Sequence, residues 1–76
     1  MNVQQIRDAY HAEPFRRFNL VLSGGQRVLV YSPDCMAISP SGRRLVVMGY
    51  REGWDNVEAA DVVSLDFSPD AQSMPA

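Results

Sequence analysis

The stretch RFNLVLSGGQRVLVYS, Arg17–Ser32, decides the fold because its hydrophobic pattern has a period of two. Phe18, Leu20 and Leu22 alternate on one face of its first half, which is typical of a β-strand. The glycines of SGGQ can take the positive φ angles that a tight turn needs. The second half continues as another strand, so the stretch predicts a β-hairpin and a mainly β protein.

On the N-terminal side of this hairpin the period becomes that of a helix. Val3, Ile6 and Tyr10 recur at spacings of three and four, which predicts a short helix over residues 3–12 with Asn2 as its N-cap. Pro14 ends it, because the residue before a proline avoids helical geometry. A helix this short does not persist alone in water, so we expect it to pack against the strands.

On the C-terminal side, SPDCMAISPSGRRLVV (residues 32–47) predicts a second hairpin. Its segment 39–42, Ser-Pro-Ser-Gly, has the proline and glycine positions of a type I turn, and a short strand precedes it. Further strands are predicted at residues 43–50, 54–59 and 62–67. In the last of these, Val63, Leu65 and Phe67 are expected to share one face.

These elements predict a mainly β fold, in which a short N-terminal helix is followed by an antiparallel meander of about five strands. The strand lengths suit a small closed barrel as well as an open sheet under the helix. Residues 1–67 are expected to form one domain of this 76-residue chain. The segment 68–76 has turn formers without apolar periodicity, so we expect a disordered tail.

The composition offers little for catalysis. One cysteine and one histidine are too few for a structural zinc site, and a single cysteine cannot form an internal disulfide. Nothing in the spacing brings His11 to Cys35, so Cys35 is predicted to be packed rather than reactive. Trp54, which stands beside a turn, is predicted to cover the core. We therefore expect a protein that is not an enzyme and has no cofactor.

The charged residues make general nucleic-acid binding a poor expectation. All seven basic residues are arginines, and nine acidic residues leave a net charge of −2, whereas such binding needs a dense basic surface. A local cluster of Arg16, Arg17, Arg43 and Arg44 remains a candidate contact for RNA or another anion.

The hydrophobic residues do not predict a membrane protein. No apolar run approaches the ~20 residues that cross a bilayer. The N-terminal residues are polar where a signal peptide would be apolar. We expect a soluble, cytoplasmic protein with no membrane partner.

Several strands are apolar on both faces, although a sheet with one wetted face should alternate between apolar and polar residues. The second face would expose an apolar patch, which usually marks an interface. We therefore predict a homo-oligomer, joined through strand faces or edges. The candidate interface residues are Val21, Leu29, Tyr31, Val46 and Met48.

Two resemblances accompany this pattern. The segments PFRRFNLVLSGGQRVLV, SPDCMAISPSGRRLVV and VEAADVVSLDF resemble a set of short bacterial single-domain proteins, a resemblance that implies no function. More distantly, Gly25, Val28, Val30, Asp34, Met36 and Ile38 follow the order of the first motif of the Sm/Hfq-like small β-barrel family. VEAADVVSLDF resembles that family's strand-corner-strand ending.

The Sm/Hfq-like resemblance implies a small Sm-like or SH3-like barrel, a ring of subunits and RNA binding. The chain departs from the family at Ala37, near the position of the base-contacting asparagine, and at Glu58 and Ala59, which replace a basic pair. Two function classes therefore stay open. One is a protein-interaction or assembly module that binds itself or another protein, which the acidic composition favours. The other is an RNA-binding ring.

Overall fold

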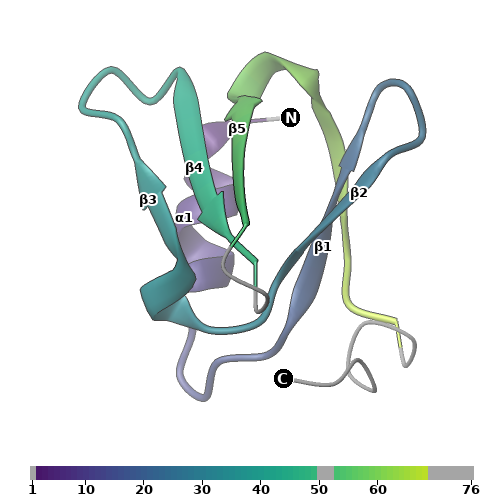
Figure 1. Cartoon of the computed structure of the whole chain (residues 1–76). Coiled ribbons are helices and arrows are strands. Elements are labelled where there is room, and N and C mark those ends of the chain that lie inside the picture. The colour runs from purple at the N-terminus through teal and green to yellow at the C-terminus, as the bar shows by residue number, and fades with distance from the viewer. Residues whose placement is uncertain (1, 50–52, 69–76) are drawn as a thin grey trace.

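The computed structural model describes residues 2–49 and 53–68 and, as the sequence predicts, is mainly β with one short N-terminal helix (Figure 1). The helix α1 spans Val3–Tyr10, and two single 3-10 turns, η1 (Pro33–Cys35) and η2 (Ala59–Asp61), interrupt the strands. The strands are β1 (Phe18–Leu22), β2 (Arg27–Val30), β3 (Met36–Ile38), β4 (Arg44–Met48), β5 (Trp54–Glu58) and β6 (Val62–Asp66).

The strands form two three-stranded antiparallel sheets, ordered β2-β1-β6 and β3-β4-β5. The prediction of a single five-stranded meander is therefore wrong. The described residues contain six strands, neither sheet closes into a barrel, and the first strand pairs with the last. Both predicted hairpins, β1–β2 and β3–β4, are confirmed.

The turn η1 is the physical reason for the division into two sheets. Pro33 opens it and has no N–H to donate to a strand ladder. The Ser32 hydroxyl accepts a hydrogen bond from the Asp34 N–H, and the Cys35 N–H donates to the Ser32 carbonyl at 3.1 Å. These local bonds turn the chain between β2 and β3, so that β3 joins the other sheet.

The register of β6 shifts where it pairs with β1. Val21 lies opposite Ser64, whereas Leu22 lies opposite Val62, so Val63 is an extra residue in β6. An extra residue of this kind interrupts the alternation of side chains between the two faces of the strand. Val62 is therefore fully buried and Val63 is 54 % exposed, so the prediction that Val63 shares one face with Leu65, which is half-buried opposite Leu20, is wrong.

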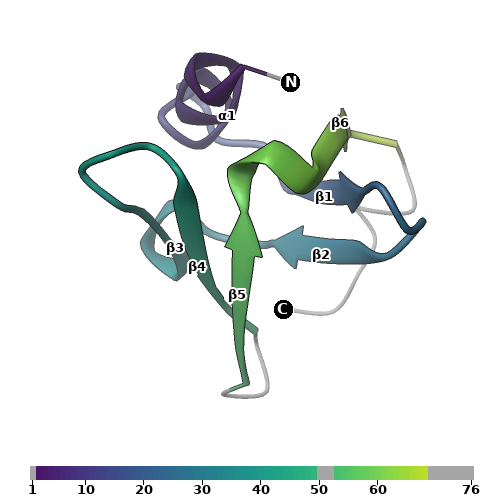
Figure 2. The same ribbon diagram turned by 90° about the horizontal axis from the view of Figure 1, so that it is seen from above.

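The helix begins as the sequence predicts. The Asn2 side chain accepts a hydrogen bond from the Gln4 N–H at 2.8 Å, and the Gln5 side chain accepts one from the Asn2 N–H at 3.2 Å, which completes a capping box. The helix is two residues shorter than predicted. It runs along one side of the β-structure (Figures 1 and 2) and buries Ile6 and Ala9 against it.

One hydrophobic core joins the helix and both sheets. Its members are the inward-facing side chains of α1 and of all six strands: Ile6, Ala9, Phe18, Leu20, Val30, Met36, Leu45, Val47, Val57 and Val62. Apart from Ser68, the predicted disordered tail lies outside the described residues. No helix in the described part of the chain is long and apolar enough to cross a membrane.

Candidate functional site

The outer face of the β3-β4-β5 sheet carries a group of apolar side chains at the surface. The register places Met48 opposite Trp54, and Val46 between Ala37 and Asn56. Trp54 is 64 % exposed, Ala37 is exposed, and Val46 and Met48 are half-buried. We call Ala37, Val46, Met48 and Trp54 the outer patch. The outer patch extends over all three strands of this sheet, including the end strand β5.

Trp54 corrects a prediction, because it was expected to cover the core and instead faces solvent. Its strand contributes only Val57 to the core. Residues an odd number of positions apart lie on opposite faces of a strand, so Trp54 points away from the face of Val57. The spacing of these two residues was the signal that could have identified the tryptophan as a surface residue.

The five residues predicted as an interface do not lie together: two are on one sheet, two are on the other, and one follows a strand. Val46 and Met48 belong to the outer patch. Val21 and Leu29 are half-buried on the outer face of the β2-β1-β6 sheet, where polar neighbours surround them: Arg27 and Ser64 flank Val21, and Asn19 lies opposite Leu29. Tyr31 follows β2, also half-buried.

β5 forms a free edge of its sheet among the described residues. It pairs with β4 on one side and has no strand on the other. Four of its five residues are exposed, with Val57 as the exception. A strand with an unpaired edge offers N–H and carbonyl groups to another strand. The outer patch and this edge therefore form one continuous candidate interaction surface.

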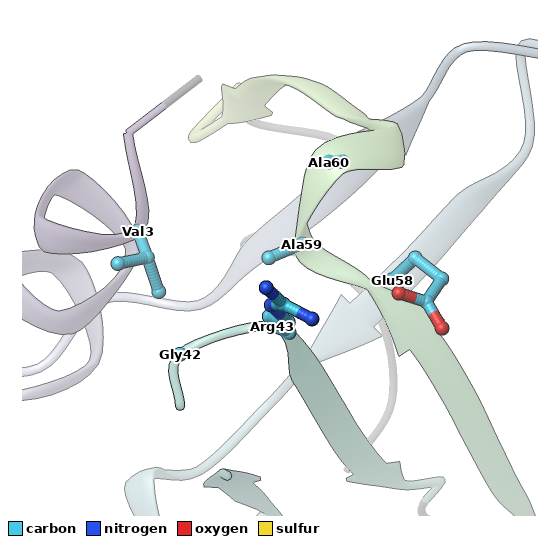
Figure 3. Close-up of a pocket in the computed structure, with 6 residues that line it drawn as sticks. All are labelled: Val3, Gly42, Arg43, Glu58, Ala59 and Ala60. Carbon is cyan, nitrogen blue, oxygen red and sulfur yellow. The ribbon is translucent and has the colours of Figure 1, made fainter. Parts of the chain in front are cut away.

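A separate pocket of about 340 Å³ lies where the start of α1 meets the β3–β4 turn and η2. Val3 forms one wall, Gly42 and Arg43 come from the turn, and the segment 58–60 closes the opposite side (Figure 3). The Gly42 N–H donates to the Ser39 carbonyl at 2.9 Å, which closes the predicted β-turn, and Gly42 has a φ of 75°. The Arg43 carbonyl accepts from the Ala59 N–H at 2.8 Å, which joins the two sides.

The four arginines predicted as an anion contact are not brought together. Arg16 and Arg17 precede β1, which starts at the bottom of Figure 1, whereas Arg43 and Arg44 stand where β4 starts at the top. Arg16 donates to the Phe67 carbonyl at 3.2 Å, and its guanidinium lies 5.2 Å from the Phe67 ring centre. Arg44 pairs with Glu58 at 3.4 Å. Only Arg43 of the four lines the pocket.

Cys35 is buried in η1, in agreement with the packing role that the sequence predicts. A hydrogen bond with the Cys35 side chain is the main cause that raises the pKa of Tyr31, followed by desolvation and by the charge of Cys35. Within residues 2–49 and 53–68, no three acidic, histidine or cysteine side chains are grouped as a metal ion requires.

Comparisons of the chain with models of protein families, with curated proteins and with solved structures found no match.

Proposed function

We propose that this chain is a non-enzymatic protein-interaction module that assembles with copies of itself through β5 and the outer patch. The observation that carries the proposal is Trp54, a large apolar side chain 64 % exposed on a strand that ends a sheet. Aromatic side chains provide much of the binding energy at interfaces. Trp54 and Met48 together form exposed apolar surface, which usually marks a site where another protein binds.

The sequence of β5 suits antiparallel pairing with a second copy. A two-fold axis at Asn56 would place Trp54 of one copy opposite Glu58 of the other. Within each copy, Arg44 forms an ion pair with Glu58 at 3.4 Å on the same face of the sheet as Trp54. The tryptophan ring of one copy would therefore pack on this ion pair of the other copy, close to the Arg44 guanidinium. This pairing buries no unpaired charge on the outer face, which supports a self-complementary interface.

We propose further that the fold is related to the Sm-like or SH3-like small barrel. The order of a helix followed by short antiparallel strands supports this, as does the 3-10 turn before the last strand. Only residues 31–35, which include η1, separate β2 from β3, so the two strands correspond to one bent strand that crosses from sheet to sheet. In this interpretation the pairing of β1 with β6 is the start of barrel closure.

The alternative function is an RNA-binding ring. One feature favours it: β5 and β6 are end strands of different sheets, so β5 of one subunit could pair with β6 of the next. Unlike edges that join head to tail can generate rings. The arginines favour it less, since Arg16 and Arg44 are engaged within the chain. Salt-dependent binding of a short U-rich or A-rich RNA would be the positive evidence.

The solution mass of two variants tests the proposed assembly. Light scattering coupled to size exclusion, at micromolar protein and moderate salt, should give the mass of an oligomer for the wild type. Trp54→Ser should move the mass towards that of the monomer. Val63→Ser is the matched control. Val63 is 54 % exposed on β6, an end strand of the other sheet, and takes no part in pairing between two β5 strands.

The two variants separate the modes of assembly. A smaller mass for Trp54→Ser alone supports pairing between β5 strands. A smaller mass for both variants supports the head-to-tail contact of β5 with β6 and would justify RNA-binding assays. A monomeric wild type up to millimolar concentration would contradict self-assembly.

A further inference from the structure

The pocket beside α1 combines features that the proposed assembly does not use. Gly42, Ala59 and Ala60 leave space, Val3 adds an apolar wall, and Arg43 projects towards Ala59 (Figure 3). A volume of about 340 Å³ is within the range of small-molecule sites, roughly 300–1,000 Å³. The pocket is therefore large enough for a small organic ligand.

Two guanidinium groups near this pocket have no partner in the described part of the chain. Arg43 is exposed, and no hydrogen bond or ion pair joins its side chain to residues 2–49 or 53–68. The same holds for the half-buried Arg7 on α1, whose Nη2 would lie 4.0 Å from a Cβ built on Gly42. Both positive charges therefore border the turn that lines the pocket.

The nearby charges do not neutralise them. Glu58 is the only acidic residue that lines the pocket, and its carboxylate pairs with Arg44 and points away from Val3 (Figure 3). The first turn of α1, which begins at the pocket wall, contains no acidic residue. The N-terminal end of the helix dipole adds a partial positive charge there. Arg43 in the pocket and Arg7 beside it are therefore two guanidinium groups that no acidic residue pairs with in the described part of the chain.

We propose that this pocket binds a small organic phosphate monoester, with the phosphate between Arg7 and Arg43 and an apolar body over Val3, Ala59 and Ala60. Arginine suits this role, because its planar fork can donate two hydrogen bonds to phosphate oxygens. A phosphate monoester carries close to two negative charges at neutral pH, which matches two unpaired guanidinium groups. A carboxylate would leave one of them uncompensated.

Titration of the ¹⁵N-labelled chain with phenyl phosphate tests the proposal. We expect saturable shifts of the amide signals of Gly42, Arg43, Ala59 and Ala60. Phenol lacks the anion and inorganic phosphate lacks the apolar body, so each should bind at least about tenfold more weakly. Arg43→Gln and Arg7→Gln should each weaken phenyl phosphate about tenfold, the loss of one charge-assisted hydrogen bond.

Arg27→Gln is the matched control, because it removes the same charge from an arginine that pairs with Asp66 on the other sheet. It should leave the affinity within about twofold. The dispersion of the amide spectrum shows that each variant is folded, and the exposed Arg43 provides the test if Arg7→Gln is not.

Three results would overturn the proposal. The first is no saturable shift at millimolar phenyl phosphate, and the second is an equal loss of affinity in Arg27→Gln. The third is inorganic phosphate or a short RNA binding as tightly as phenyl phosphate. The last result would indicate recognition of the anion alone.

Discussion

At the scale of single residues, the Asp66 carboxylate accepts two hydrogen bonds and forms an ion pair. It is only part-exposed and accepts hydrogen bonds from the Ser68 N–H at 2.8 Å and from the Ser68 hydroxyl at 3.1 Å. Arg27 forms an ion pair with it across β1. The bonds from Ser68, and then Arg27, lower the pKa of Asp66 below its ordinary value.

This lowered pKa predicts a pH dependence of stability. The folded state binds the proton of Asp66 less readily than the unfolded state. The contribution is therefore fully present above the ordinary carboxyl pKa, about 4, and is lost as the pH falls through the lower folded-state pKa. Asp66→Asn should lower the free energy of unfolding at pH 7, and the difference from wild type should shrink below about pH 4.

Urea denaturation of both proteins between pH 7 and pH 2 measures this effect. Ser68→Ala is the graded control, because it removes the hydroxyl bond to Asp66 and keeps the backbone N–H bond. Its pH dependence should lie between those of wild type and Asp66→Asn. Parallel stability curves for wild type and Asp66→Asn at all pH values would contradict the prediction.

At the scale of elements, α1 depends on its contact with the strands. Eight residues are too few for a stable isolated helix, even with a complete capping box. Ile6 is fully buried and belongs to the core. Ile6→Ala should therefore lower the free energy of unfolding by about 2–5 kcal/mol.

Gln4→Ala is the matched control on the exposed side of the same helix, where the Gln4 side chain donates a hydrogen bond to the Asp8 carboxylate at 2.9 Å. It should change stability by less than about 0.5 kcal/mol. The midpoints of urea unfolding give both values. Equal midpoints for the two variants would show that docking of α1 adds little stability.

The elements also show what the sequence could predict. The helix and both hairpins depend on local patterns: the capping residues around Asn2, the alternation of Phe18, Leu20 and Leu22, and the glycine turns. The pairing of β1 with β6 joins segments about forty residues apart and has no local signal. The extra residue Val63 follows from that pairing, so its exposure could not be predicted either.

The candidate sites divide in the same way. The sequence identified Arg43, Val46 and Met48 from residue type and alternation. The pocket around Arg43 needs Val3 and Ala59 as well, and only the tertiary structure brings these three distant segments together. The position of Trp54 beside a turn predicts a cover over the core, but its odd spacing from the buried Val57 places it on the solvent face of β5.

At the scale of the whole molecule, the two sheets share one core. Phe18, Leu20 and Val30 come from one sheet, and Leu45 and Val47 from the other, yet all belong to the same buried cluster. Neither sheet has a core of its own, since each has only three short strands. The sheets should therefore unfold together in one cooperative transition.

Native-state hydrogen exchange of two matched variants tests this cooperativity. Leu20 on β1 and Leu45 on β4 are both fully buried, one in each sheet. Leu20→Ala and Leu45→Ala should each lower the opening free energy of the slowest amides by about 2–5 kcal/mol, and by the same amount in both sheets. A loss confined to the sheet that carries the substitution would mean that the sheets open independently. The small domain would then be two weakly coupled units, and the assembly proposed through β5 would stabilise only one of them.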